Sequence, residues 1–182
     1  MIKRAFDLIV SIAACIVTLP LWLFIAVGVK LSSAGPVLFR QQRVGRFGRP
    51  FTLYKFRSMR TASVQPGPCI STSNDPRITR FGQYLRASKM DELPQLINVI
   101  KGDMSLVGPR PEVPEIVKLY TPEQAKVLSV RPGLVGPAQI IGRSESSMFP
   151  KDVKDPVAYY IKHILPDKLV IDLEYSKQAR LL

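Results

Sequence analysis

The sequence predicts a mixed, helix-rich α/β fold in which an apolar helix-break-helix segment precedes one small domain of short helices and a small β-hairpin. Three observations favour this fold class. The chain has no charged residue from Leu8 to Val29, it carries two short strand-like segments around a glycine-bearing loop, and its 16 prolines divide the remainder into short elements. A chain of 182 residues has the usual size of one domain with its own core, about 100 to 200 residues.

The uncharged N-terminal run is long enough to cross a membrane. As one helix it would measure roughly 33 Å, against a hydrocarbon core of about 30 Å. Pro20 lies in its middle, however, and basic residues flank both ends, namely Lys3, Arg4 and Lys30. Positive flanks favour the cytoplasmic side for both ends. We therefore predict a re-entrant membrane hairpin over residues 1–32, bent near Pro20, that forms one folding unit with a cytoplasmic domain over residues 33–182. A single-pass anchor is the alternative, while the length of the run disfavours a cleavable signal peptide.

The segments that follow alternate between strand, loop and helix signals. Val37 to Val44 and Pro50 to Phe56 resemble two strands around Gly45-Arg46-Phe47-Gly48, which predicts the hairpin. Residues 61–75 are rich in Ser, Pro, Gly and Asn, which predicts a loop. Arg77 to Arg86 has apolar residues at helical spacing, which predicts a helix.

Pro94 determines how the next segment is interpreted. An interior proline costs a helix about 3 kcal/mol, whereas one in the first turn costs little. This predicts a helix from Asp91 to Lys101, closed by Gly102. Short helices are expected at 114–120 and 122–128 and an apolar stretch at 133–141. A last helical segment starts at Pro156, is broken at Pro166, and ends in a helix whose apolar face carries Leu169, Val170, Leu173 and Tyr175.

The net charge indicates an anionic partner. Lys and Arg outnumber Asp and Glu by 26 to 14, giving a formal charge of +12, so nucleic acid, a lipid surface or a phosphorylated substrate all fit by composition. The basic residues gather at turns rather than alternating with aromatic ones, which disfavours nucleic acid. Two unlike cysteines, Cys15 and Cys69, and the single His163 indicate neither a disulfide framework nor a zinc site.

Asp91 and Glu92 form an acidic pair at the start of the predicted helix. A carboxylate there faces free N–H groups and the positive end of the helix dipole, which favours its ionised form. That suits a nucleophile or a metal ligand. Taken alone, Asp91 fits an ordinary N-cap equally well, or the acidic partner of Ser88 in a capping box.

Several basic residues are candidates for binding phosphate. Arg86, Arg110 and Arg131 each lie beside a turn or a proline, and Arg110 is locked between Pro109 and Pro111. A guanidinium held in this way can bind phosphate oxygens through two hydrogen bonds. Lys55 and Arg57, at the end of the second strand, add positive charge. For each of these residues taken singly, a solvated surface charge is the alternative.

Together these features resemble a known family, the monotopic phosphoglycosyl transferases, which are the small catalytic-domain form of the bacterial sugar transferases that initiate lipid-linked glycan assembly. The matching segments run in order over nearly the whole chain: Lys3-Arg4-Ala5-Phe6-Asp7, Gly35-Pro36-Val37-Leu38-Phe39, Gln42-Arg43-Val44-Gly45, Tyr54-Lys55-Phe56-Arg57-Ser58-Met59, Asp75-Pro76-Arg77-Ile78-Thr79, Asp91-Glu92-Leu93-Pro94-Gln95-Leu96, Gly102-Asp103-Met104-Ser105-Leu106-Val107-Gly108-Pro109-Arg110-Pro111 and Arg131-Pro132-Gly133.

The resemblance implies transfer of a sugar-1-phosphate from a UDP-sugar to polyprenyl (undecaprenyl) phosphate, with release of UMP. This reaction initiates glycoconjugate, O-antigen, capsule or exopolysaccharide synthesis. The resemblance also implies that Asp91 is the nucleophile, forms a covalent phosphosugar intermediate and contacts Mg²⁺, and that Glu92 completes a catalytic dyad. The implied substrate-binding residues are Lys55, Arg57, Arg86, Arg110, Pro111 and Arg131. The implied location is the inner (cytoplasmic) membrane, with membrane lipids as partners, no nucleic acid, and a homo-oligomer left open.

One segment departs from the family. Many members have Gly-Trp-Ala-Gln where this chain has Gly136-Pro137-Ala138-Gln139, so no role for that tryptophan carries over. The alternative function is that of a membrane-tethered basic binding or scaffold protein without catalysis.

Overall fold

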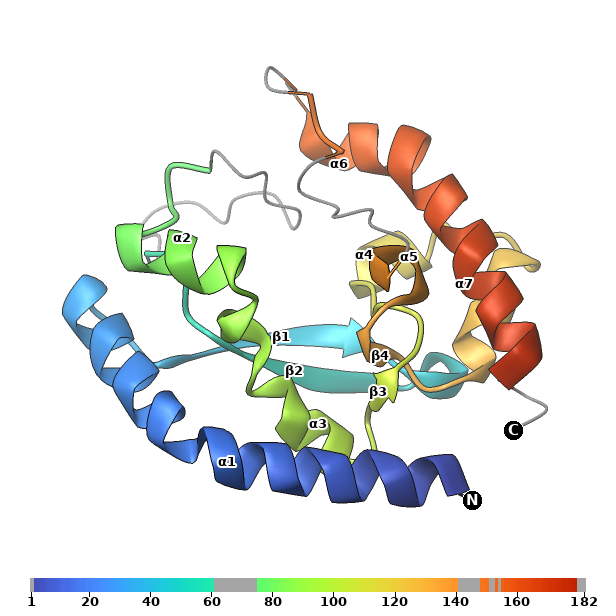
Figure 1. The fold of residues 1–182 in the computed structure, drawn as a ribbon. Helices are drawn as coiled ribbons and strands as arrows, with labels where there is room; N and C mark the ends of the chain where they lie inside the picture. The colour runs from blue at the N-terminus through green and yellow to red at the C-terminus, as the bar shows by residue number, and fades with distance from the viewer. Residues whose placement is uncertain (1, 61–74, 141–147, 151–152, 154, 180–182) are drawn as a thin grey trace.

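The computed structural model describes residues 2–60, 75–140, 148–150, 153 and 155–179. Its elements confirm a mixed, helix-rich fold with a small hairpin (Figure 1). In chain order they are α1 (Ile2–Ser32), β1 (Leu38–Val44), the 3₁₀ turn η1 (Arg46–Gly48), β2 (Pro50–Phe56), α2 (Arg80–Ala87), the 3₁₀ turn η2 (Met90–Glu92), α3 (Gln95–Lys101), β3 (Ser105–Val107), α4 (Pro114–Val117), η3 (Gln124–Ser129), β4 (Gly133–Val135), α5 (Pro137–Ile140), α6 (Pro156–Tyr159), the π-helical turn η5 (Tyr160–Ile164) and α7 (Leu165–Ala179).

The N-terminal segment is one helix that bends rather than two helices with a break between them. α1 continues through Pro20, and its two halves run in different directions (Figure 1). Thr18 Oγ1 donates to the carbonyl of Ala14 at 2.7 Å and accepts from Trp22 Nε1 at 3.0 Å. A proline removes one helical hydrogen bond and a back-bonded threonine favours bending, so these residues account for the change of direction.

Both ends of α1 are bonded to the rest of the chain. Near its start, Arg4 donates to the carbonyls of Val99 and Ile100 at 2.7 and 3.1 Å. The buried Asp7 accepts from Ser105 Oγ at 2.8 Å. Beyond its C-terminal end, Arg57 Nη2 donates to the carbonyl of Ser33 at 2.6 Å. The helix therefore packs along the domain instead of extending away from it.

The two small sheets differ in strand direction and in whether the sequence predicted them. β1 and β2 pair antiparallel from Leu38 opposite Phe56 to Val44 opposite Pro50, as the sequence predicted. β3 and β4 pair in parallel, which no pattern in the sequence indicated. The backbones approach closely there, because a Cβ on Gly133 would lie 2.1 Å from the nitrogen of Gly108. Glycine is thus required where these segments meet.

Three hydrophobic clusters hold the described parts together. One joins α1 to β2 and α2 and includes Ile25, Val29 and Phe56. A second lies between β2 and α3, around Leu53 and Val99. The third and largest packs α7 and η5 against α4 and η3. α3 is thereby fixed between the β1–β2 hairpin and α1. The turn η2 just before α3 carries the acidic pair Asp91 and Glu92.

Several predicted boundaries need correction. α3 begins at Gln95 rather than Asp91, because Asp91 and Glu92 form the separate turn η2. The last helix is not broken at Pro166: a π-helical turn precedes it, and such a wider turn accommodates the ring and the missing N–H. Val170 is 68% exposed, so it does not belong to the buried face of α7. Of the predicted 61–75 loop, residues 61–74 lie outside the described residues.

The other predicted helices are confirmed with shorter bounds. The 77–86 helix is α2, which begins after Thr79, whose hydroxyl accepts from the nitrogen of Gly82 at 2.9 Å. The 114–120 segment contains α4, and the predicted 122–128 helix is the 3₁₀ helix η3, which begins at Gln124 and ends at Ser129. The predicted division at residue 33 between hairpin and domain stays a prediction.

Candidate active site

The backbone changes direction sharply between α2 and the turn η2, which carries Asp91 and Glu92. Lys89 has a φ of 59°, a left-handed conformation that ends α2 and starts η2. The hydroxyl of Ser88 donates back to the carbonyls of Tyr84 and Leu85 at 2.7 and 3.2 Å. Ser88 therefore belongs to the end of α2, which contradicts the capping-box alternative.

Asp91 and Glu92 are both buried, at 6% and 7% exposure. Carboxylates are rarely buried to this degree unless they are paired or functional. The turn that carries them packs against both α2 and β2, so their position is set by elements from two parts of the chain.

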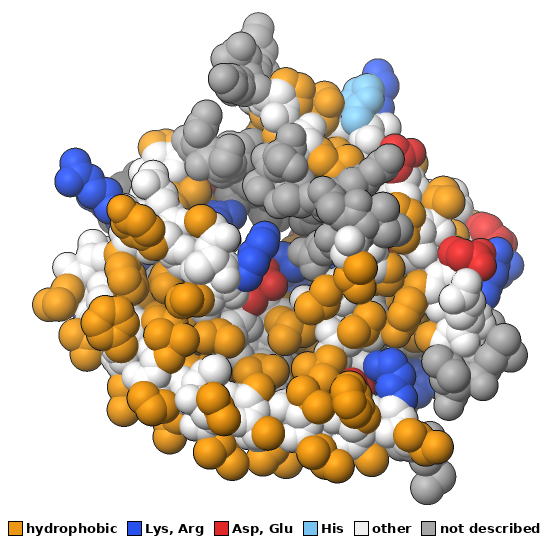
Figure 2. All heavy atoms as spheres, viewed as in Figure 1, with side chains coloured by type: hydrophobic (Ala, Val, Ile, Leu, Met, Phe, Trp, Pro, Cys, Tyr) orange, Lys and Arg blue, Asp and Glu red, His pale blue; other side chains and the backbone are white. Residues whose placement is uncertain are grey.

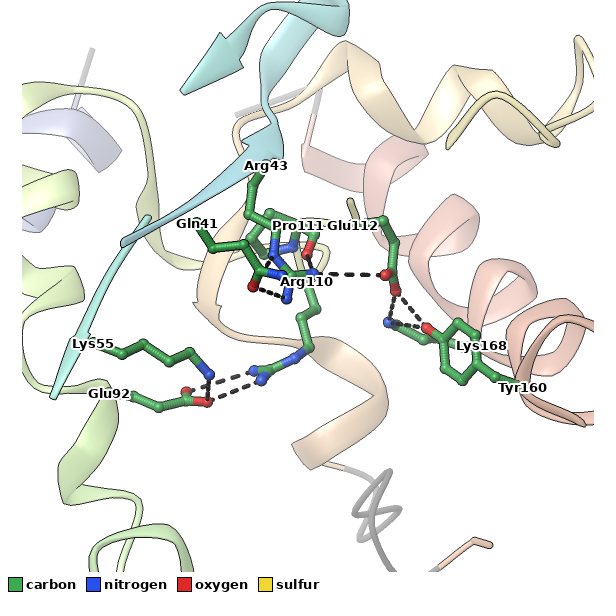
Figure 3. Close-up of polar contacts among 9 residues, drawn as sticks. All are labelled: Gln41, Arg43, Lys55, Glu92, Arg110, Pro111, Glu112, Tyr160 and Lys168. Carbon is green, nitrogen blue, oxygen red and sulfur yellow. Dashed lines mark hydrogen bonds and ion pairs between the residues drawn. The ribbon is translucent and has the colours of Figure 1, made fainter. Parts of the chain in front are cut away.

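Glu92 is held by two cations from distant segments (Figure 3). Its Oε1 accepts from Lys55 Nζ at 2.8 Å and from Arg110 Nη2 at 2.9 Å. Arg110 Nη1 also donates to Oε2 at 3.5 Å, so the guanidinium contacts both carboxylate oxygens. Charge-assisted contacts of this kind fix orientation as well as adding energy.

The two neighbouring carboxyl groups differ electrostatically. Burial by itself raises the pKa of Glu92, but Arg110 and Lys55 outweigh it and hold that pKa well below the ordinary value for glutamate. Burial also raises the pKa of Asp91, and there the opposing effects of Lys55, Arg86 and Arg110 do not reverse the shift. The expectation that the helix N-terminus favours the ionised form of Asp91 is therefore wrong, since α3 begins only at Gln95 and burial dominates.

Lys55 is itself perturbed by its surroundings. Burial lowers the pKa of its ammonium group, and the positive charge of Arg110 lowers it further, against the opposite effects of Glu92 and Asp91. One buried site thus holds two carboxyl groups and two cationic groups in mutual contact or electrostatic reach. Perturbed titratable groups of this kind are characteristic of functional sites.

The segment that carries Arg110 is rigid. Gly108 N donates to the carbonyl of Val135 at 3.1 Å, and Gly133 N donates to the carbonyl of Pro109 at 2.8 Å. Arg43 Nη1 donates to the carbonyl of Pro111 at 3.0 Å. With prolines on both sides of Arg110 and these backbone bonds, the side chain has a fixed base from which to reach Glu92.

The structure brings some of the predicted residues together and places others elsewhere. Lys55, Arg110 and the acidic pair meet, and Arg86 is near enough to influence the pKa values of both Asp75 and Asp91. Arg57 instead binds the carbonyls of Ser33 and Val29 at the end of α1. Arg131 donates to the carbonyl of Gly102 at 3.0 Å, after the end of α3. Pro111 takes part through its carbonyl, which binds Arg43.

A second buried polar cluster went unnoticed in the sequence. Glu112, Tyr160 and Lys168 are buried together, and Arg43 reaches the same carboxylate at 3.8 Å (Figure 3). Two signals were present. Glu112 directly follows Pro111, and Lys168 lies at helical spacing from the apolar Ile164 and Leu165.

The acidic pair does not form a closed metal site, but Asp91 is a carboxylate that a phosphate-bound magnesium ion could use. Among the residues that the structure describes, no group of three or more His, Cys, Asp or Glu is arranged to hold a metal. Magnesium in phosphoryl-transfer sites is commonly bound by one or two carboxylates together with substrate phosphates and water. Asp91 could supply such a carboxylate, since Glu92 is already paired with two cations.

Comparison with known proteins identifies the family. The model of the bacterial sugar transferase family matches residues 1–182. The chain is 44% identical over 146 residues to the uncharacterized sugar transferase EpsL of Bacillus subtilis, a match covering 80% of this chain and 71% of that protein. It is 39% identical over 179 residues to the exopolysaccharide production protein PSS of Rhizobium leguminosarum, covering 94% of this chain and 90% of that protein.

A longer relative shares the same region. The UDP-glucose:undecaprenyl-phosphate glucose-1-phosphate transferase of Xanthomonas campestris is 42% identical over 180 residues, which is 94% of this chain and 36% of that protein. The family model spans the segments that form the helix α1, the β1–β2 hairpin and the buried acidic pair. The chain belongs to the bacterial sugar transferase family.

Proposed function

We propose that this protein transfers a sugar-1-phosphate from a UDP-sugar to undecaprenyl phosphate and releases UMP. The observation that carries the proposal is the buried pair Asp91 and Glu92 with Lys55 and Arg110 in contact with the second carboxylate. Relatives named as UDP-glucose:undecaprenyl-phosphate glucose-1-phosphate transferases, at 37% to 44% identity, support it. A relative named for exopolysaccharide production is consistent with the same product class.

The chemistry we propose has two displacements at one phosphorus atom. In the first, a carboxylate oxygen of Asp91 attacks the sugar-bearing phosphorus of the UDP-sugar, and the bond to the bridging oxygen breaks as UMP leaves. In the second, an oxygen of undecaprenyl phosphate attacks the same phosphorus and breaks its bond to Asp91. Covalent catalysis of this type replaces one difficult step by two easier ones.

The neighbouring residues have separate roles in this scheme. Glu92, held ionised by Arg110 and Lys55, fixes both cations beside Asp91. The cations then stabilise negative charge that develops on the transferring phosphoryl group. Arg86, which influences the pKa of Asp91, adds to the same positive field. Asp91 would hold Mg²⁺ together with the phosphates of the donor, and the ion would supply neutralisation of phosphate charge.

The arrangement of α1 supports a re-entrant position in the inner membrane. It is long and apolar enough to cross a bilayer by length and composition alone, which is weak evidence by itself. Large apolar side chains are exposed along it, including Ile9, Val17 and Phe24 at 69%, 77% and 69%, and Figure 2 shows apolar side chains covering its outer side. Water does not favour so extensive an apolar surface, whereas lipid does.

The bonds at the two ends of α1 favour a bent, re-entrant helix over a helix that spans the bilayer. Arg4 near the start and Ser33 just beyond the end are both hydrogen-bonded to the same small domain. A helix that crossed the bilayer would separate its ends by about 30 Å of hydrocarbon, with one end on each side. We propose instead that both ends face the cytoplasm and that the bend at Pro20 points into the membrane.

The proposed function is tested by measuring UMP release. The purified protein is supplied with undecaprenyl phosphate, Mg²⁺ and a panel of UDP-sugars, and the Asp91→Asn variant serves as the control. We expect UMP with at least one donor, dependent on the lipid acceptor for continued turnover, and none from the variant. Binding of a UDP-sugar or of anionic lipid without UMP release from the parent protein would favour the non-catalytic scaffold.

A further inference from the structure

α7 presents a buried polar face to the segment that carries Arg110. Lys168, Asp172 and Ser176 are spaced four residues apart, so they lie on one side of the helix, and they are 6%, 2% and 3% exposed. Polar residues are mostly found on protein surfaces. A row of three buried ones therefore calls for an explanation beyond packing.

Lys168 is part of a compact network around Glu112. Its Nζ lies 2.5 Å from Glu112 Oε1 and donates to Tyr160 Oη at 2.8 Å. The hydroxyl of Tyr160 donates to the same carboxylate oxygen, and Arg43 approaches the other oxygen (Figure 3). The carboxylate of Glu112 is thereby fixed from α7, η5 and β1 at once.

Residues 107–112 form the segment that carries Arg110, and their N-terminal end is also hydrogen-bonded to α7. Tyr175 Oη donates to the carbonyl of Val107 at 2.9 Å. Lys168 and Tyr175 thus hold the two ends of residues 107–112, and Arg110 lies between them. Val44 N donates to the carbonyl of Glu112 at 2.9 Å, so the backbone at this end is tied to β1 as well.

Stability alone is a poor explanation for this network. Well-packed apolar residues often stabilise a core as well as a buried ion pair, or better, because burying charge is costly. Charged groups do, however, specify one geometry, since their hydrogen bonds are directional. The guanidinium of Arg110 meets Glu92 at 2.9 Å, and a displaced backbone would require a different rotamer of Arg110 to keep that contact and its two-oxygen geometry.

We propose that Glu112 and Lys168 are positioning residues that hold Arg110 in place for phosphoryl transfer. The inference rests on the proposed function, because the residue they position is one that we place beside the transferring phosphate. Neither residue touches the reacting atoms. They act through the rigid segment Val107–Glu112, and α7 thereby becomes part of the catalytic apparatus.

A double-mutant cycle on turnover tests the proposal. Lys168→Met keeps the volume of the side chain but removes the bond to Glu112, and Arg110→Lys removes the group being positioned. We expect Lys168→Met alone to lower kcat/KM on the order of tenfold to hundredfold, the effect of a misplacement of about 1 Å. In the Arg110→Lys background the same change should have little further effect. Equal fold losses in both backgrounds would overturn the proposal.

Leu169→Ala provides the matched control. Leu169 is the next residue on α7, is 2% exposed and packs in the hydrophobic cluster, so its truncation loosens α7 without touching Glu112. Its loss of activity should be the same in both backgrounds. If Lys168→Met does not fold, Glu112→Gln combined with Lys168→Met removes both charges together, which is tolerated far better than leaving one buried charge unpaired.

A second measurement does not depend on catalysis. Amide hydrogen exchange of residues 107–113 should be several-fold faster in Lys168→Met than in the parent, while Leu169→Ala should raise exchange in α7 rather than selectively in that segment. Absence of UMP release from the parent would refute the proposed function, and hydrogen exchange would still decide whether Lys168 holds the segment. Unchanged exchange at 107–113 in Lys168→Met would refute the positioning role.

Discussion

Replacing the two adjacent carboxylates one at a time should change stability in opposite directions. Glu92→Gln keeps the shape of the side chain but removes the charge that pairs with Lys55 at 2.8 Å and Arg110 at 2.9 Å. Breaking a buried ion pair by removing one partner costs about 3–5 kcal/mol. The cationic side chains are 18% and 20% exposed, so we expect the lower end, about 3 kcal/mol.

Asp91→Asn should instead stabilise the fold at neutral pH. Burial raises the pKa of Asp91, which means that keeping this carboxylate ionised in the folded state costs free energy. The amide carries no such charge. A group that destabilises the fold is expected at a catalytic position, where activity and stability conflict.

Thermal and denaturant unfolding at pH 7 in detergent measure both changes. A loss of about 3 kcal/mol corresponds to a decrease in Tm of about 6–12 °C for a chain of this size. Glu92→Gln combined with Lys55→Met is the control, because removing the amine also relieves its repulsion from Arg110 and should recover part of the loss. Equal Tm values for the parent and Glu92→Gln would show that the ion pairs do not support the fold.

The pH dependence gives an independent test of the same reasoning. The pKa of Glu92 is lowered in the folded state, so its stabilisation is complete above the ordinary glutamate pKa of about 4.3 and is lost as the pH falls below it. The difference between the parent and Glu92→Gln should therefore shrink in acid. The pKa of Asp91 is raised, so the advantage of Asp91→Asn should decline through that raised value and vanish below the ordinary aspartate pKa of about 3.9. A constant difference between pH 7 and pH 3 would contradict both assignments.

Three further predictions concern activity and topology. Asp91→Asn should abolish turnover while remaining folded, and intact-mass analysis of the parent with UDP-sugar alone should show a phosphosugar adduct that the variant lacks; turnover by the variant would remove Asp91 from the nucleophilic role. Arg110→Lys keeps the charge but loses the two-pronged contact with Glu92, so kcat/KM should fall at least about tenfold with little change in Tm, and an unchanged rate would make Arg110 merely structural. Cysteines introduced as Ile2→Cys or Leu31→Cys, at positions 88% and 85% exposed, in a Cys15→Ala, Cys69→Ala background, should react with an impermeant thiol reagent only after cell lysis; labelling of residue 2 in intact cells would mean that α1 spans the membrane.

Local patterns were sufficient to predict the parts of the fold that depend on neighbouring residues. Two short strand-like segments around a glycine-bearing loop predicted β1 and β2 to within one residue. Gly102, with a φ of 93°, closes α3 as expected, because only glycine adopts that conformation without strain. The π-helical turn before Pro166 was not predictable in this way, because widening a helix around a proline depends on how the surrounding core packs.

The features of the candidate site also fall into those that local sequence predicts and those that depend on tertiary contacts. The sequence by itself determined the acidic pair, the proline-locked Arg110 and the apolar N-terminal segment, since each is a contiguous motif whose chemistry follows from residue type and spacing. Only the tertiary structure decided that Lys55 and Arg110 meet at Glu92 rather than Asp91. It also decided that Arg57 and Arg131 bind backbone carbonyls. In the same way, it brought Glu112 into contact with Lys168, which lies on a helix 56 residues further along the chain. Burial reversed the expected pKa shift of Asp91 for the same reason. Desolvation and ion pairing depend on which residues surround a charge in three dimensions, and sequence spacing does not specify those neighbours.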